Sequence, residues 1–497
     1  MKEDSLKKRY VIKLLANIIS GIIGAVIVAI VPKALGPIAY GQFVYLQDFF
    51  MKVIGFLDMG SSIAFFTKLS AKKNRKELIT FYFLYSFLAL LIVVLFIYLV
   101  KVFGYRDIIL PNIPNEYIFM GLFFGFFTWF TQIFIKISDA YALTVSVELI
   151  KIGHKILSLF LLIYFIYFIS FDLSSYFYFH YISLFSFLII ITMLFIKKEI
   201  LTDLFNFKFS FKSLTKEFVS YCHPLFAYSI IGLAGGFFDI WLLQKISGSE
   251  QTGFYGLAYS LAAMCFLFTS AMTPIITREF SKSYEQKDLE NMKKLFYRYI
   301  PMLYSIAAYF AVFISFQSEN VIDMFTDDKF KDATLVLCIM ALYPIHQTYG
   351  QLSGSIFYAT GQTKILRNIS YFTVPIGILV SYLLIEVFDL GAIGLAYKML
   401  IIQFIGVIIQ LLFNAKFLNL EIKHFIFHQL YSIIFFAILA FCASLISLES
   451  SLYSFLSSGI LYTILVIIGI YIFPQIFAVN RTEIKVNIKK MLNKVKN

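Results

Sequence analysis

The sequence contains few cysteines and few clustered metal-binding residues. Four cysteines occur among 497 residues, each singly inside an apolar stretch, at Cys222, Cys265, Cys338 and Cys442. This spacing favours neither a disulfide framework nor a zinc site. The histidines are equally scattered, and a lone histidine in an apolar run is more often a core residue than a ligand. We therefore expect no metal site and no cofactor.

Motifs of enzyme chemistry are also missing. The chain has no glycine-rich phosphate loop, no Gly-x-Ser-x-Gly nucleophile turn and no cluster of histidine with carboxylates. These absences disfavour an ATPase, and they disfavour a membrane glycosyltransferase that works through a carboxylate site. The sequence predicts a protein that is not an enzyme.

Charged residues are scarce, at 14% of the chain, whereas 60% of the residues are hydrophobic and the mean hydropathy is +0.82. A soluble protein of this length would precipitate with such a composition. The sequence therefore predicts an all-α polytopic membrane protein. The net charge of +13 comes from basic residues in short loops between apolar runs, so a membrane explains it better than a nucleic acid does.

Apolar runs long enough to cross a bilayer recur along the whole chain. We predict fourteen spans, at about 11–31, 41–66, 78–100, 117–138, 147–169, 177–196, 218–242, 254–277, 296–316, 333–358, 368–388, 391–414, 425–447 and 455–476. No soluble domain interrupts them. One of the longest connections, 278–295, is interpreted as a short surface helix.

Positive charges separate the two sides that these spans define. Thirty of the 42 lysines and arginines lie in the termini and every second loop, six lie in the other loops, and six lie within or beside spans. By the positive-inside rule, both termini are predicted to be cytosolic. Apolar residues form one stripe of the basic tail, 479–497, which predicts an amphipathic helix on anionic lipid. A frayed tail is the alternative.

A tight turn at Leu35–Gly41 joins the first two spans, with Gly36 free to take a positive φ. Gly248–Tyr259, between spans seven and eight, is similar, because both segments have a glycine, a short polar step and a tyrosine beside a glycine. Coincidence is the alternative to an internal duplication. The duplication predicts two six-helix lobes around a central cavity and two additional C-terminal helices, at 1–210, 211–415 and 416–478.

Five segments carry a family resemblance. They read LGPIAYGQF, FLDMGSSIA, FDIWLLQKISGSEQTGFYGLAYSLA, FTDDKFKDATLVLCIMALYP and YATGQTKILRN, in this order along nearly the whole chain. Together they resemble the signature segments of Wzx-type polysaccharide flippases, which belong to the multidrug/oligosaccharidyl-lipid/polysaccharide exporter superfamily. Each motif alone is loose and rich in common residues.

The resemblance implies a substrate and a place in the cell. The substrate would be an undecaprenyl-pyrophosphate-linked oligosaccharide, moved from the cytosolic to the periplasmic leaflet of the bacterial inner membrane. Such a step serves the biosynthesis of O-antigen, and hence of lipopolysaccharide, or of another surface polysaccharide. Membrane lipid and other polysaccharide-assembly proteins are the implied partners.

Lysines within spans are the candidate substrate-binding groups, because a sugar chain and a pyrophosphate need a hydrated path that carries cations. Lys52 lies near the middle of span two. Asp48 is four residues earlier on the same helical face, so a pair that only holds the helix in place is an equal alternative. Asp58, near the cytosolic end of this span, is a candidate coupling or structural charge.

Span five carries a charged stripe, with Glu148, Lys151 and Lys155 at spacings of three and four and His154 beside them. The stripe is net positive, so its two lysines are further candidates for substrate binding. Snorkelling to the headgroups is the alternative. Asp139, at the end of span four, and Glu148 are candidate coupling or structural charges.

Two further spans each contain a deep charge. Asp239 in span seven and Lys398 in span twelve have no opposite charge at helical spacing, so partners must come from another helix or from water. We predict that Lys52 and Lys398 face a shared hydrated cavity and help to hold the anionic head of the substrate. Arg278, at the cytosolic mouth, either screens pyrophosphate or is an ordinary positive-inside residue.

Three other functions stay open. A drug or organic cation antiporter of the same superfamily needs acidic residues in its cavity, and Asp58, Asp139 and Asp239 keep this alternative open. A polysaccharide polymerase is expected to carry a large external loop, whereas the longest external loop here, at about 101–116, is short. A scaffold gives no reason for Asp239 and Lys398, which have no opposite charge at helical spacing. A proton or sodium gradient is the candidate driving force.

Overall fold

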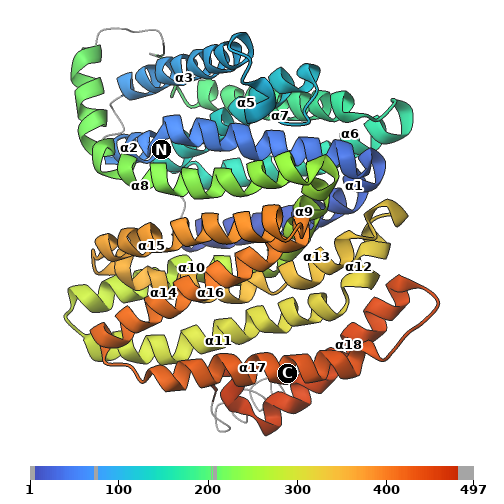
Figure 1. Ribbon diagram of the computed structural model, residues 1–497. Coiled ribbons are helices and arrows are strands. Elements are labelled where there is room, and N and C mark those ends of the chain that lie inside the picture. Colours follow the sequence, from blue (N-terminus) through green and yellow to red (C-terminus); the bar gives the residue numbers. More distant parts are fainter. Residues whose placement is uncertain (1–5, 72–75, 203, 205–209, 480–497) are drawn as a thin grey trace, which may run out of the picture. The chain divides into compact units, whose positions relative to one another are not determined.

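The computed structural model describes residues 6–71, 76–202, 204 and 210–479 (Figure 1). Every regular element in this part of the chain is a helix, so the predicted all-α fold is confirmed. The predicted amphipathic tail lies outside the described residues, except for Val479. The chain divides into two compact units, unit 1 up to Gly253 and unit 2 from Phe254 onward. The two predicted six-helix lobes, 1–210 and 211–415, were inferred from an internal repeat and have other bounds than these two units. They stay a prediction.

Unit 1 is built from long apolar helices. Its elements are α1 (Leu6–Asp58), α2 (Ser61–Ala71), α3 (Glu77–Val102), α4 (Arg106–Ile109), α5 (Asn115–Ala140), α6 (Thr144–Phe168), α7 (Leu173–Lys197), α8 (Phe211–Ile246) and the start of α9 (Gly248–Ala263). α1 packs against α5, α6 and α8, and α5 packs against α7. Aromatic rings pack together in the core between these helices. The ring centroid of Phe43 lies 4.6 Å from that of Tyr176 and 5.3 Å from that of His180.

The helix α1 consists of two arms that meet at Gly36. This residue has a φ of +77°, which side chains rarely allow, so the positive φ predicted from the sequence is confirmed. The second arm ends at Asp58, and Met59 and Gly60, both with positive φ, precede α2. Span two, predicted as one run over 41–66, is therefore broken. The break is stabilised because the backbone N–H of Ser62 donates to Asp58 Oδ1 at 2.9 Å.

The helix α8 runs antiparallel to the second arm of α1 and to α2. Near the start of α8, Glu217 pairs with Lys68 of α2 at 2.7 Å. Just beyond the end of α8, the backbone of Ser249 lies against that of Gly41. Gly248 between α8 and α9 has a φ of +83°, so the second of the two similar turns also begins with a glycine of positive φ.

Unit 2 contains the rest of α9 and a second set of helices. They are η1 (Met264–Phe266), α10 (Leu267–Glu285), α11 (Leu289–Phe316), α12 (Ser318–Phe325), η2 (Asp328–Phe330), α13 (Ala333–Met340), α14 (Tyr343–Ala359), α15 (Thr363–Tyr382), the π-helical turn η3 (Leu383–Val387), α16 (Gly391–Leu418), α17 (Ile422–Ser444), α18 (Ser451–Ile472) and η4 (Pro474–Phe477). α11 packs against α14 and α17, and α14 packs against α16. Their buried side chains form one continuous apolar core.

The short surface helix predicted at 278–295 is wrong. α10 continues to Glu285, and α11 begins only four residues later, at Leu289. Asp288 caps α11, since its Oδ1 accepts a hydrogen bond from the backbone N–H of Asn291 at 2.9 Å. Two long helices therefore extend into this connection, and the charged residues belong to their ends.

Ten helices in the described part of the chain are long and apolar enough to cross a membrane. One of them is α1, whose two arms correspond to two predicted spans. Three more predicted spans correspond to α8, to α9 with α10, and to α13 with α14. Each of the fourteen predicted spans thus has a helix, or a pair of helices, in the structure, and the protein is a multi-pass membrane protein.

Candidate functional site

Lys52 lies in a cluster of charges between the second arm of α1 and α8. Its Nζ donates to Asp48 Oδ2 at 2.5 Å, so the pair that the spacing of four allowed is formed. The same Nζ donates to the backbone carbonyl oxygen of Gly236 on α8, also at 2.5 Å. The Lys52 and Asp48 side chains keep 25% and 31% of their surface exposed. The ammonium is therefore shared between a carboxylate of its own helix and the backbone of another.

Gly236 makes this second contact possible. A Cβ at this position would lie 3.3 Å from Cε of Lys52 and 3.6 Å from its Nζ. Because glycine has no Cβ, the lysine lies directly against the backbone of α8. Sequence reasoning missed this residue, and the only available signal was a glycine pair, Gly235 and Gly236, inside an apolar run.

Asp239 belongs to the same cluster. It lies three residues after Gly236 on α8 and is 7% exposed. Its charge acts on Asp48, so the cluster brings two carboxylates near one ammonium. The sequence did not predict this proximity, because the two aspartates lie on helices that are nearly 200 residues apart along the chain. The structure thus places Asp48, Lys52 and Asp239 together within unit 1.

Lys398 has a similar setting in unit 2. It is 8% exposed on α16, and its stem lies against Gly377 of α15. A Cβ at Gly377 would lie 3.2 Å from Cε of Lys398 and 3.6 Å from its Nζ. Lys398 is thus buried where α16 packs against α15, and the absence of a side chain at Gly377 leaves room for it. Because Lys52 and Lys398 lie in different units, the cavity that they were predicted to share stays a prediction.

Asp58 is the acceptor at the centre of a group of hydroxyls. Its Oδ1 accepts from Ser61 Oγ and from Tyr82 Oη, each at 2.8 Å. Its Oδ2 accepts from Ser62 Oγ at 2.7 Å, and Lys136 Nζ donates to that same hydroxyl. These bonds fix the break between α1 and α2. Asp58 therefore stabilises the break between the two helices. Its predicted role in coupling transport to an ion gradient stays a prediction.

The charged stripe of span five lies on α6 and is divided. Glu148 is 3% exposed and accepts a hydrogen bond from Lys151 Nζ at 2.9 Å. His154 Nε2 contacts the backbone carbonyl oxygen of Ser183 on α7 at 2.8 Å. Lys155 is exposed. The stripe thus contains one partly buried ion pair and one exposed lysine.

Asp139 lies at the end of α5 in unit 1, and Arg278 lies on α10 in unit 2. Asp139 Oδ1 accepts a hydrogen bond from Thr144 Oγ1 at 2.8 Å across the turn between α5 and α6. Arg278 is exposed on α10 in unit 2. Among the described residues, no group of three or more histidine, cysteine, aspartate or glutamate side chains could hold a metal ion.

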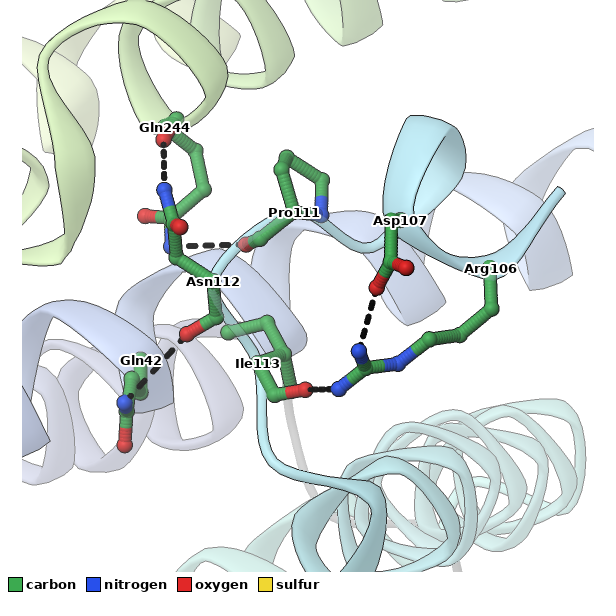
Figure 2. Close-up of polar contacts among 7 residues, drawn as sticks. All are labelled: Gln42, Arg106, Asp107, Pro111, Asn112, Ile113 and Gln244. Carbon is green, nitrogen blue, oxygen red and sulfur yellow. Dashed lines mark hydrogen bonds and ion pairs between the residues drawn. The ribbon is translucent and has the colours of Figure 1, made fainter.

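Residues 103–114, which we name the strap, connect α3 to α5 and join α1 to α8 (Figure 2). Asn112 Nδ2 donates to the backbone carbonyl oxygen of Gln244 at 3.0 Å, and Gln244 Nε2 donates to that of Pro111 at 3.1 Å. Gln42 Nε2 on α1 reaches the carbonyl oxygen of Asn112 at 3.4 Å. In the sequence, this segment was recognised only as a short connection.

The two similar turns meet at the same end of unit 1. A Cβ at Gly41 would overlap the backbone carbonyl oxygen of Ser249, and a Cβ at Gly253 would overlap that of Pro37. Gly41 and Gly253 each lie five residues after the first glycine of their turns, so the contact is reciprocal. Their backbones approach this closely only because both residues are glycine.

Three solved structures of membrane transporters are similar to this chain in fold. The lipid II flippase MurJ in an inward closed conformation has a TM-score of 0.67 and 15% identity, over 93% of this chain and 98% of MurJ. A multidrug resistance MATE family transporter of the MOP superfamily, in an inward-facing conformation, has a TM-score of 0.59 and 14% identity, over 84% of this chain and 95% of that one. An outward-facing MATE structure gives 0.53 and 15% identity, over 83% and 94%. The chain therefore has the fold of MOP superfamily transporters.

Models of two protein families match the amino-acid sequence of the chain. No curated protein sequence matches the chain. The MatE family model matches residues 224–383, and the model of the family described as polysaccharide biosynthesis protein matches residues 6–280, more than half of the chain. The chain therefore belongs to the polysaccharide biosynthesis protein family.

Proposed function

We propose that the protein is a flippase that moves a lipid-linked oligosaccharide across the bacterial cytoplasmic membrane. The substrate would be an undecaprenyl-pyrophosphate-linked repeat unit, delivered to the external leaflet for O-antigen or another surface polysaccharide. The observation that carries the proposal is the ammonium of Lys52, held within a membrane span by groups from two helices in a chain of the polysaccharide biosynthesis family. The fold shared with the flippase MurJ supports it.

The orientation of the protein in the membrane is inferred from the distribution of positive charge. Thirty lysines and arginines in the termini and every second loop, against six in the other loops, support cytosolic termini by the positive-inside rule. The strap then lies on the external side. A cysteine at Asn493 that reacts with an impermeant thiol reagent from outside the cell would contradict this orientation.

The chemistry of the substrate explains why buried lysines matter. A pyrophosphate carries negative charge that hydrocarbon does not solvate, whereas the prenyl chain stays in the bilayer. Lys52 and Lys398 each supply an ammonium within a span, and each is a compact donor suited to phosphate oxygens. Lys151, Lys155 and Arg278 are secondary candidates, of which Lys155 and Arg278 are exposed.

A cation antiporter is the second candidate function, and one observation favours it. Asp48 and Asp239 lie close enough for their charges to interact, and two neighbouring carboxylates can hold a proton or a cation. The MatE match over residues 224–383 includes Asp239. In a flippase, the same carboxylates would be the groups that couple transport to a proton or sodium gradient.

Transport by the purified protein in proteoliposomes distinguishes the two functions. The probes are an undecaprenyl-pyrophosphate-linked N-acetylglucosamine and a fluorescent organic cation. We expect the lipid-linked sugar to become accessible to an external lectin faster than in protein-free vesicles, with no accumulation of the cation. Cation accumulation without movement of the lipid would refute the flippase and support the antiporter.

A further inference from the structure

The strap is held by side chains of the two helices that it joins. On the side of α1, Tyr45 Oη donates to the backbone carbonyl oxygen of Ile109 at 2.6 Å. On the side of α8, Trp241 Nε1 donates to that of Ile108 at 2.6 Å. With the contacts of Gln42 and Gln244, four donors from the helices point at main-chain oxygens of the strap. The strap therefore presents its backbone as a row of acceptors to both helices.

Gln244 is the central residue of this arrangement. It is 0% exposed, and its Nε2 donates both to the Pro111 carbonyl oxygen and to Ser249 Oγ, the latter at 2.8 Å. Its own backbone carbonyl oxygen accepts from Asn112. A single residue thus connects the strap, the end of α8 and the start of α9.

The strap combines a buried anchor with a pre-formed bend. The side chains of Leu110 and Ile113 are each 1% exposed, so the segment packs onto the unit rather than lying in solvent. Asn112 has a φ of +58°, a conformation that asparagine tolerates better than most residues. Arg106 bonds to Asp107 and to the carbonyl oxygen of Ile113, which closes the segment on itself.

We propose that the strap is an external latch that holds the external end of α8 against the second arm of α1. Hydrogen bonds to backbone oxygens are individually weak and re-form readily, which suits a contact that opens and closes. In the transport cycle, Gln244 releases the strap, the end of α8 moves away from α1, and the head of the substrate leaves. The release of the substrate in this cycle rests on the proposed flippase function, whereas the latch itself does not require a substrate.

The first test follows opening of the strap without any substrate. In a full-length protein lacking its four native cysteines, Leu110→Cys reports exposure to an impermeant maleimide added from outside. We expect Gln244→Met and Asn112→Asp each to raise the labelling rate at least about fivefold. Glu116→Gln, an exposed change beside the strap, is the control and should leave the rate unchanged. Equal labelling in all three variants would overturn the latch.

The second test locks the strap. Pro111→Cys with Gln244→Cys is joined by a short bifunctional thiol reagent, and the same pair treated with a monofunctional reagent is the control. We expect the joined protein to move undecaprenyl-pyrophosphate-linked N-acetylglucosamine at least about tenfold more slowly than the control. Equal rates would overturn the latch. If the unmodified protein moves no lipid while the labelling responds as expected, the latch stands and the flippase function fails.

Discussion

Lys52 and Lys398 place their side chains against glycines of neighbouring helices at nearly the same distances. The residues near them on their own helices differ. α1 supplies Asp48 one turn before Lys52, and the two form an ion pair. α16 has no acidic residue within four positions of Lys398. Loss of the Lys52 ammonium therefore leaves a carboxylate of the same helix without its ion pair, whereas loss of the Lys398 ammonium does this to no acidic residue within four positions on α16.

The largest effect is expected at Lys52. Lys52→Met keeps much of the side-chain volume but leaves the Asp48 carboxylate, which also feels the charge of Asp239, without its ammonium. We expect a loss of about 3 kcal/mol in the free energy of unfolding, at the lower end of the range for a buried pair because both side chains keep some exposure. Thermal unfolding of the detergent-solubilised protein measures it.

The double variant Lys52→Met with Asp48→Leu is the control for this prediction. The double variant removes the Lys52 ammonium together with its carboxylate partner on α1, so most of the lost stability should return, without return of transport. Asp239 is present in both variants, so the difference between them isolates the Asp48 carboxylate. A double variant as unstable as the single one would show that the pair does not stabilise α1. Lys52 and Lys398 would then differ less than the structure indicates.

Substitution of the two glycines should give an intermediate effect. Gly236→Ala and Gly377→Ala each place a methyl group within 3.3 Å of a lysine Cε, so each lysine must shift. We expect losses of about 1–3 kcal/mol, as for other overpacked sites. The controls are Gly232→Ala on α8 and Gly406→Ala on α16, where a Cβ meets open space. Equal stability of all four variants would contradict the close seating of both lysines.

Hydropathy and charge were sufficient to predict the helical class and the fourteen spans, because each span must be apolar by itself. The breaks within spans were missed, because the break after Asp58 depends on hydroxyls that approach from α3 and α2. The Asp48–Lys52 pair was predictable from one helix. The places of Gly236, Asp239 and Gln244 were not, because they depend on how α8 packs against α1.

The smallest effect is expected at Tyr82. Tyr82→Phe removes the hydrogen bond to Asp58 and the contact with Ser61 Oγ, while Ser61 and Ser62 keep their own bonds to Asp58. The loss should be about 1.5 kcal/mol, at the lower end for a hydrogen bond to a carboxylate, because Ser61 and Ser62 still donate to Asp58. Tyr98→Phe, at an exposed position of the same helix, should cost nothing measurable. A loss above about 3 kcal/mol would show that Tyr82 stabilises the fold by more than its hydrogen bonds explain.

Movement of undecaprenyl-pyrophosphate-linked N-acetylglucosamine by Lys398→Met and Lys398→Arg proteoliposomes tests the central claim most directly. The claim is that a buried ammonium helps to carry an anionic lipid-linked sugar. We predict that Lys398→Met inserts in normal amounts but moves the lipid at least about tenfold more slowly, whereas Lys398→Arg keeps part of the rate because it keeps the charge. A normal rate in Lys398→Met at a normal protein level would contradict the claim.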